Sequence, residues 1–280
     1  MKLSQLGQLF FRQSSQHQRS NATSVSYDQA CGPFGRTIIA IGDIHGQLSA
    51  LEKLLKKISA ENFDSNTEKI FVFLGDYIDR GPSSKGVIDR LLDWSSKHKT
   101  IFLKGNHEAI FLDFLEKPTS TGQWLSYGGL ETLIDYGVIP EAGAKKHSDL
   151  FDLRERLLEN LPESHLSFFN RLRLSYGSGD FMFVHAGVNP KIPISDNTEE
   201  DLLWIRGHFL GHRGLFEKLI VHGHTITMDG RPEIKPNRVG IDTGSYVNGT
   251  ITAMIIEGEN KYFINSKLPE SFNPDHPSSH

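Results

Sequence analysis

Short apolar runs alternate with helical patterns along the first half of the chain. Three strands are predicted by runs of β-branched and aromatic residues: Thr37–Ile41, Ile70–Leu74 and Thr100–Lys104. Three helices are predicted by apolar residues at helical spacing: Gln47–Ser59, a helix opened by Pro82 and Ser83, and His107–Leu115. A strand–helix–strand order of this kind predicts parallel strands that place a functional site at their carboxyl ends.

The pattern becomes helical in the middle of the chain and returns to strands near its end. Between about residues 116 and 176 we expect helices over Leu150–Leu161 and Pro162–Leu174, and a turn at residues 126–129. Five further strands are predicted: Phe181–Val184, Leu219–Val221, Val239–Ile241, Ile251–Ile256 and Tyr262–Ile264. The last two have the spacing and turn residues of an antiparallel pair. We therefore predict an α/β fold with two packed mixed sheets flanked by helices (αββα), and a helical insertion at 116–176.

The two ends of the chain differ in composition from the part between them. Residues 1–35 are rich in Ser and Gln and contain no acidic residue before Asp28. We expect this N-terminal extension to be disordered, although a targeting peptide has a similar composition. Residues 266–280 contain three prolines and are expected to form a disordered tail. The predicted domain therefore spans residues 36–265.

Composition excludes several classes of partner. The formal net charge is −4, so no basic surface suggests that the protein binds nucleic acid or an anionic membrane. No apolar stretch approaches the ~20 residues that a membrane-spanning helix needs. The single cysteine, Cys31, excludes an intramolecular disulfide and fits a reducing compartment. We expect a cytoplasmic globular protein and make no prediction about its oligomeric state.

Each of the first three predicted strands ends at a short polar motif. These motifs are Gly-Asp-Ile-His-Gly at 42–46, Gly-Asp-Tyr-Ile-Asp-Arg-Gly at 75–81 and Gly-Asn-His-Glu at 105–108. Neighbouring strand ends would gather four side chains at one sheet edge: Asp43, His45, Asp76 and Asn106. Such a mixed set of nitrogen and oxygen ligands suits divalent metals. Helix capping would account for the aspartates, but it explains neither His45 nor the adjacent acid and arginine at 79–80.

Two later strands also end at a histidine and a glycine, at residues 185–187 and 222–224. The ordered set of five motifs resembles the phosphoprotein phosphatase branch of the calcineurin-like metallophosphoesterases over about residues 37–264. It is most similar to the compact bacterial and phage members. The resemblance implies two divalent metal ions, with Mn²⁺ expected and iron or Zn²⁺ as alternatives. It assigns Asp43 and His45 to the first ion, Asn106, His185 and His224 to the second, and Asp76 as a bridge.

The same resemblance implies roles for residues around the metals. A hydroxide shared by the ions would attack phosphorus, His107 would protonate the leaving oxygen, and Asp79 would orient His107. Arg80 and Arg206 would bind the phosphoryl oxygens. Secondary expectations are that Glu108 supports its loop, that Tyr246 lies near the leaving group, and that His222 is structural and points away. Five further histidines match no motif and are expected to be solvated: His98, His147, His165, His208 and His212.

The motifs leave three functions open. The first is a serine/threonine protein phosphatase that acts on a phosphorylated protein or peptide. The second is a symmetrical bis(5'-nucleosyl)-tetraphosphate hydrolase, which is similar in every motif quoted above. The third is a non-catalytic phosphate-binding relative, which would require a missing ligand or acid, and none is missing. We favour the first.

Overall fold

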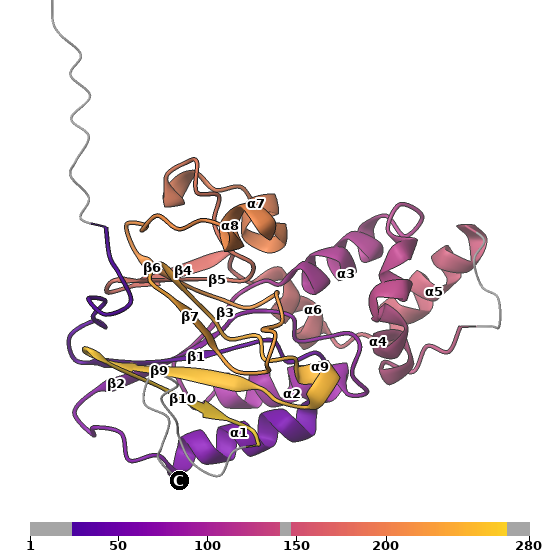
Figure 1. Cartoon of the computed structure of the whole chain (residues 1–280). Helices are drawn as coiled ribbons and strands as arrows, with labels where there is room; N and C mark the ends of the chain where they lie inside the picture. Colours follow the sequence, from indigo (N-terminus) through magenta and orange to yellow (C-terminus); the bar gives the residue numbers. More distant parts are fainter. Residues whose placement is uncertain (1–23, 141–146, 268–280) are drawn as a thin grey trace, which may run out of the picture.

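The fold contains two β-sheets, and strand β1 lies at the centre of the first (Figure 1). The structure is a computed structural model that describes residues 24–140 and 147–267. The order of the first sheet is β10-β9-β1-β2-β3. Its strands are β1 Arg36–Ile41, β2 Glu68–Phe73, β3 Thr100–Phe102, β9 Thr252–Glu257 and β10 Asn260–Asn265. Strands β1, β2 and β3 pair in parallel, whereas β9 and β10 are antiparallel. Both arrangements confirm the sequence prediction.

The second sheet has the order β4-β5-β6-β8-β7. Its strands are β4 Ser175–Ser178, β5 Phe181–Val184, β6 Leu219–His222, β7 Glu233–Lys235 and β8 Arg238–Gly240. Strands β5, β6 and β8 are parallel, and the two edge strands, β4 and β7, are antiparallel to their neighbours. The sequence pattern missed these edge strands because they are short and carry few apolar residues, so hydrophobicity gives little signal at such positions.

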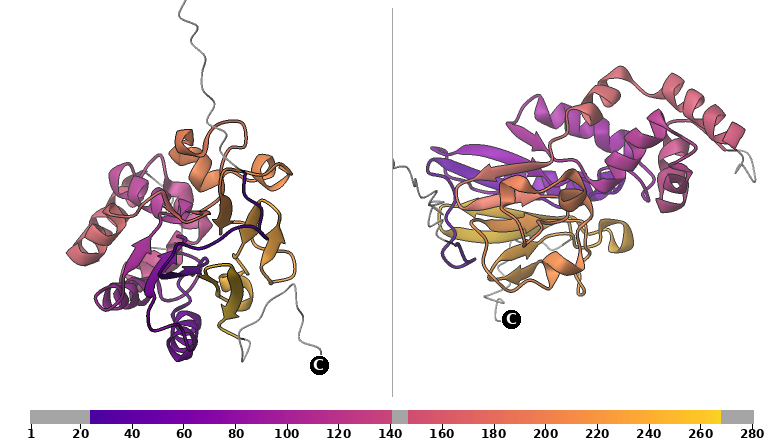
Figure 2. Two further views of the ribbon diagram at one scale, coloured as in Figure 1. Left: turned by 90° about the vertical axis from the view of Figure 1, so that its left-hand side faces the viewer. Right: turned by 90° about the horizontal axis from the view of Figure 1, so that it is seen from above.

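Alternate residues of the first sheet face different layers. In β1, Ile38 and Ala40 belong to the core between the two sheets, together with Phe183 and Val221 of the second sheet. The intervening Ile39 packs instead in the cluster formed with the helices outside the first sheet. This period of two places one apolar face against each layer. Figure 2 shows the resulting helix–sheet–sheet–helix arrangement, which confirms the predicted fold class.

Nine α-helices are described outside the sheets. They are α1 Leu48–Ala60, α2 Ser84–Ser95, α3 Asn106–Glu116, α4 Gly129–Asp135, α5 His147–Asn160, α6 Glu163–Asn170, α7 Glu199–Trp204, α8 Gly207–Leu210 and α9 Ser245–Asn248. Helices α1 and α2 cover the outer face of the first sheet. Phe209 of α8 and Leu202 of α7 pack in a smaller cluster with β6 residue Ile220.

The predicted helical insertion projects to one side of the sheets (Figure 1). It contains α4, α5, α6 and a 3-10 helix, η1, at Gly122–Tyr127. Trp124 of η1 is fully buried and packs against Phe111 and Phe114 of α3. The expected turn falls at Gly128, whose φ of 110° lies in the left-handed region, but the sequence did not reveal the helices on either side.

Residues 25–33 are largely packed, although we assigned residues 1–35 to a disordered extension, whereas Phe34 is fully exposed. Val25 N–H donates to the Phe216 carbonyl at 3.0 Å, and Tyr27 N–H donates to the Pro236 carbonyl at 2.9 Å. Ala30 is fully buried. This segment therefore covers part of the second sheet. The expected disorder of residues 1–23 and 268–280 concerns residues outside the described part of the chain. Ser266, which we assigned to the disordered C-terminal tail, is buried, and its N–H donates to the Ile251 carbonyl.

His165 corrects the expectation that the unmatched histidines are solvated. Its side chain is buried, with Nδ1 2.7 Å from the Tyr136 hydroxyl and Nε2 2.9 Å from Asp89 Oδ1. Both ring nitrogens are bonded, which removes the cost of burying them. His98 stacks on Trp94 at 4.0 Å and is half-buried.

The other three unmatched histidines have different environments. His208 is exposed and His212 is half-buried, whereas the expectation for the His147 side chain lies outside the described part of the chain.

None of the helices within 24–140 and 147–267 combines the length and the apolar character that are needed to span a bilayer.

Candidate metal centre

The motif residues occupy strained backbone at the strand ends. In the described residues, the non-glycine residues with positive φ are His45, Asp76, Asp79, Arg80 and His224, with φ between 47° and 71°. L-residues disfavour this region, and such strain clusters at functional sites. All five are residues that the sequence analysis assigned to the site. The strained backbone conformation at these positions therefore orients the side chains toward the site and costs conformational free energy.

Glu108 supports the loop that carries Asp76, as expected. Its carboxylate accepts hydrogen bonds from the backbone N–H groups of Asp76 at 2.9 Å, Tyr77 at 2.8 Å and Gly105 at 2.9 Å. A Cβ at Gly105 would lie 2.1 Å from Asp76 Oδ1, so only glycine fits beside this carboxylate. Glu108 is fully buried and faces backbone rather than the open site.

Four donor atoms converge in the first of two groups. Asn106 Oδ1 lies 2.9 Å from both His185 Nε2 and His224 Nδ1, and these two nitrogens are 3.2 Å apart. His185 Nε2 is also 3.4 Å from Asp76 Oδ1. Ligands bound ~2.1 Å from one ion lie roughly 3.0 Å apart in octahedral and 3.4 Å apart in tetrahedral coordination. The spacing of these atoms therefore fits a single divalent ion.

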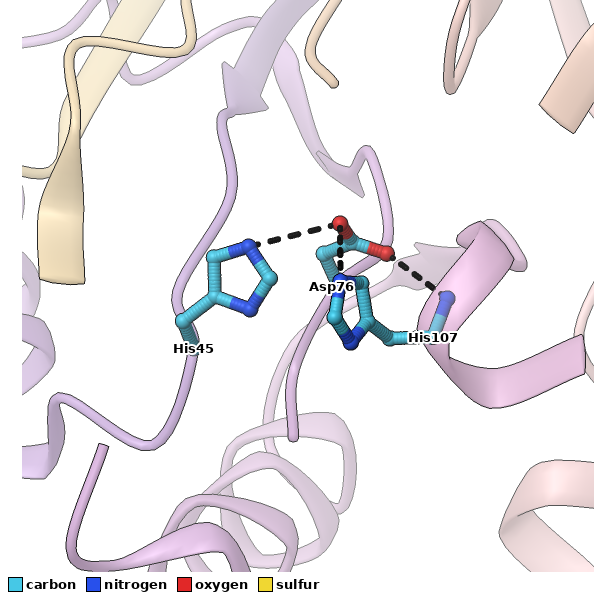
Figure 3. A group of neighbouring side chains, drawn as sticks. All are labelled: His45, Asp76 and His107. Atoms are coloured by element: carbon cyan, nitrogen blue, oxygen red, sulfur yellow. Dashed lines mark hydrogen bonds and ion pairs between the residues drawn. The ribbon is translucent and has the colours of Figure 1, made fainter. Parts of the chain in front are cut away.

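The second group uses the other oxygen of Asp76 (Figure 3). His45 Nε2 lies 3.4 Å from Asp76 Oδ2, while His45 Nδ1 is held by the Ile78 carbonyl at 3.0 Å. That carbonyl requires a proton on Nδ1, so Nε2 carries a lone pair, which lies 3.3 Å from the Arg80 Nη1 donor and could bind a metal instead. His107 Nε2 lies 3.9 Å from the same oxygen, so it also belongs to this group by distance.

Asp43 provides the clearest sign that cations belong here. Its Oδ2 accepts from the His224 N–H at 2.9 Å, but its buried Oδ1 has no hydrogen-bond partner among the described residues. Burial raises the pKa of Asp43 well above its usual value, and the neighbouring Asp242 and Asp76 raise it further. An orphaned carboxylate oxygen among like charges is costly. A divalent cation would remove that cost, so the residues present fit a metal.

Asp242 is a site residue that sequence reasoning missed. It is buried, and burial together with Asp76 raises its pKa to about 6. It lies two residues after β8, as Asp43 lies two residues after β1, so the same signal of an acid at a strand end could have identified it.

Three histidines of the two groups are held in the neutral, metal-binding form: His45, His185 and His224. Burial lowers the pKa of His45 to about 3 and that of His224 to about 2, and it also lowers the pKa of His185. A neutral imidazole offers a lone pair, whereas a protonated one cannot bind a cation. His222 lies apart from both groups, because its Nδ1 faces the Gly223 carbonyl and its ring packs 5.1 Å from Phe209. It is structural, as expected.

His107 differs from the other site histidines. Its Nδ1 lies 2.7 Å from Asp79 Oδ2 in a fully buried pair. Burial alone would lower the pKa of His107, but attraction to Asp76 and the bond to Asp79 outweigh it and raise the pKa. This imidazole therefore tends to keep its proton at the pH where its neighbours have lost theirs.

The two arginines flank the metal groups. The Arg80 guanidinium lies 4.3 Å from the ring centre of Tyr246, whose ring is in turn 5.1 Å from that of His45. Tyr246 therefore lies beside the site, close to where the sequence analysis expected it. Arg206 lies beside the group of donor atoms that includes His224, where it donates to Thr225 Oγ1 at 3.1 Å and to the His224 carbonyl at 3.5 Å. Arg206 is thus next to His224, and all ten predicted site residues lie in one region of the structure.

Comparison with known proteins identifies the class. Residues 36–232 match the model of the calcineurin-like phosphoesterase family, so the chain belongs to that family. It is therefore a metallophosphoesterase, a hydrolase of a family that uses two divalent ions, in agreement with the His and Asp clusters described above.

Individual relatives differ in their substrates. The chain is 29% identical over 259 residues to bis(5'-nucleosyl)-tetraphosphatase PrpE [asymmetrical] of Anoxybacillus flavithermus, covering 84% of this chain and 97% of the relative. It is 38% identical over 95 residues to serine/threonine-protein phosphatase 1 of Salmonella typhimurium, covering 34% of this chain and 39% of that one.

A solved structure described as a putative diadenosine tetraphosphatase aligns with a TM-score of 0.55 at 21% identity. It covers 83% of this chain and 94% of that one. A mutant cold-active protein tyrosine phosphatase aligns with a TM-score of 0.54 at 16% identity, covering 85% and 80%. At these identities the structural likenesses support the fold alone.

Proposed function

We propose that the protein is a metal-dependent serine/threonine protein phosphatase that hydrolyses phosphomonoesters. The observation that carries the proposal is the sharing of Asp76 between two groups of donor atoms, next to a buried His–Asp pair. In this proposal Asp43, His45 and Asp76 hold one ion, and Asp76, Asn106, His185 and His224 hold the other. We propose Mn²⁺ as the ion, because carboxylate and amide oxygens suit it; the imidazoles of the set would also accept iron or Zn²⁺.

Two bound divalent ions supply positive charge at the phosphoryl group and lower the pKa of water. The chain's own residues supply the remaining chemistry. His107 donates the proton on Nε2 to the leaving oxygen, which as an alkoxide would leave poorly without it. Asp79 fixes the Nδ1 proton at 2.7 Å and keeps Nε2 directed at the site. A positioned acid of this kind contributes typically ~10²–10⁴ in rate.

Arg80 and Arg206 are proposed to bind the phosphoryl oxygens from two sides. A guanidinium presents paired N–H groups that match phosphate oxygens. Tyr246 supports the Arg80 guanidinium through its ring face at 4.3 Å. As partner we propose a phosphorylated protein or peptide in the cytoplasm, since the net charge of −4 argues against nucleic acid and anionic membranes as partners.

Hydrolysis of a dinucleoside tetraphosphate is the second candidate function. It is supported by the PrpE relative, which aligns over 84% of this chain, whereas the phosphatase relative aligns over 34%. Exposed rings on both sides of the site would suit nucleobases, because bases stack on aromatic faces. Tyr246 is 37% exposed, and Trp204 is 42% exposed with its ring 6.4 Å from that of His224.

The two candidates are separated by kcat/KM for a phosphoserine peptide and for diadenosine tetraphosphate, each with Mn²⁺. We expect the peptide to be preferred. A preference for the dinucleotide of about tenfold or more would replace the first proposal by the second. Products then reveal the cleavage: two ADP from symmetrical attack, and ATP with AMP from the asymmetrical attack named for the relative.

A further inference from the structure

The carboxylate of Asp79 is bonded to side chains of the helical insertion. Asp79 is fully buried. Its Oδ2 accepts from His107 Nδ1 at 2.7 Å and from the Trp124 indole N–H at 2.8 Å, and its Oδ1 accepts from the Thr132 hydroxyl at 2.6 Å. Trp124 lies in η1 and Thr132 in α4, so two of these three bonds come from a segment outside the five motifs.

Thr132 also holds the backbone of Asp79. Its Oγ1 accepts from the Asp79 N–H at 3.0 Å and lies 2.9 Å from Ser84 Oγ. The only hydroxyl proton of Thr132 is directed to Asp79 Oδ1, so Ser84 must donate to Thr132. Asp79 has a φ of 71°, a conformation that its own backbone disfavours. Thr132 therefore fixes both the main chain and the carboxylate of Asp79.

The same segment contacts the next residue of the motif. Arg80 N–H donates to the Gly128 carbonyl at 3.1 Å, and Arg80 Nε donates to the Tyr127 carbonyl at 3.4 Å. Gly128 is required at this contact, because a Cβ there would lie 2.6 Å from the backbone nitrogen of Arg80. Residues 122–135 thus hold the Asp79–Arg80 pair from outside the sheet.

We infer that Trp124 and Thr132 are positioning residues that orient Asp79 and, through it, the ring of His107. The helical insertion would then complete the general acid rather than only cover the site. The inference rests on the proposed role of His107 as that acid. Charge-assisted bonds to a buried carboxylate are strong and directional, so losing one donor lets the carboxylate turn and releases the imidazole.

Leaving-group dependence separates positioning from a merely structural role. Phenolate, whose conjugate acid has a pKa of about 10, needs protonation as it leaves, whereas 4-nitrophenolate is far less basic and does not. A misoriented acid should therefore slow phenyl phosphate selectively. A general disturbance of the fold or of metal binding would slow both esters alike.

The test compares Trp124→Phe and Thr132→Val with matched controls. For phenyl phosphate we expect kcat to fall at least ~10-fold with KM unchanged within about twofold, and for 4-nitrophenyl phosphate a fall below about threefold. Thr132→Ser keeps the hydroxyl and should behave as wild type. Trp94→Phe is the matched tryptophan control, because Trp94 is buried and its indole N–H has no hydrogen-bond partner in the described structure.

A second readout does not depend on activity. In the metal-free protein, the downfield proton NMR signal of His107 Nδ1–H should move or broaden in Trp124→Phe and Thr132→Val, and stay in place in Trp94→Phe. Equal loss on both esters, no loss on either, or an unmoved signal would overturn the inference. If Trp124→Phe does not fold, Thr132→Val alone carries the test.

The variant His107→Gln distinguishes a failure of this inference from a failure of the proposed function on which it rests. If His107→Gln slows both esters equally, the acid role in the proposed function is wrong. If it slows phenyl phosphate selectively while Trp124→Phe and Thr132→Val do not, only the positioning role is wrong.

Discussion

Replacing Asp76 by asparagine tests the shared carboxylate directly. Asp76 Oδ2 faces His45 Nε2 at 3.4 Å, and Oδ1 faces His185 Nε2 at 3.4 Å. Asparagine has a single side-chain oxygen, so whichever way its amide is turned, one group faces an NH₂ that cannot bind a cation. We therefore expect Asp76→Asn to bind no more than one ion tightly.

The expected loss of activity follows from the charge removed. Metal ions stabilise developing charge by several kcal/mol. Losing about 3–4 kcal/mol of this stabilisation would slow kcat roughly 10²–10³-fold, since each 1.36 kcal/mol is tenfold. The assay is elemental analysis after reconstitution and gel filtration, together with kcat for 4-nitrophenyl phosphate. Asp152→Asn, an exposed acid of α5 paired with Arg156 at 3.3 Å, is the matched control.

The reasoning is refuted if Asp76→Asn retains two ions per chain with affinities like those of wild type. Retention of one ion with full activity would instead show that a single metal is sufficient.

Three further predictions concern metal binding, substrate recognition and stability. Chelation should lower Tm, since each site holding an ion at 100 times its Kd adds about 2.7 kcal/mol of stability; an unchanged Tm after verified metal removal contradicts it. Trp204→Ala should raise KM for diadenosine tetraphosphate roughly tenfold, because one stacked base is worth about 1–3 kcal/mol, and should leave KM for 4-nitrophenyl phosphate unchanged. Equal changes in KM for the two substrates would rule out stacking. His165→Phe should lower the free energy of unfolding by about 1–3 kcal/mol, measured in urea, because the buried Tyr136 hydroxyl loses its partner at 2.7 Å; His208→Phe, at an exposed position, is its control.

The strand ends could be predicted from sequence because two independent signals coincide there. An apolar run predicts each of these parallel strands, and a short motif with glycine and an aspartate, asparagine or histidine follows it directly. For β5, the run gave the observed bounds, Phe181–Val184. Where a segment is short and amphipathic, as in α4 and α7, neither periodicity nor composition is long enough to decide, and those helices were missed.

Contacts between distant segments explain the remaining gaps in the site. Asp242 follows a strand of only three residues, so the apolar signal before it is weak. Trp124 and Thr132 look like ordinary core positions in the sequence, since no spacing links them to Asp79, which is 45 and 53 residues away. His165 was expected in solvent because a sequence shows no partner, and its two partners come from α2 and the end of α4.

Backbone strain connects these observations. The non-glycine residues with positive φ in the described chain are five site residues, and the left-handed region costs roughly 1–2 kcal/mol for each. Their sum, about 5–10 kcal/mol, is comparable to the whole net stability of a typical domain. Such a site persists only if surrounding contacts offset the strain. Glu108 does so at Asp76, and Thr132, Ser84 and Gly128 do so at Asp79 and Arg80. The site geometry therefore depends on the motifs and also on contacts from α2 and the helical insertion, which hold Asp79 and Arg80 in place.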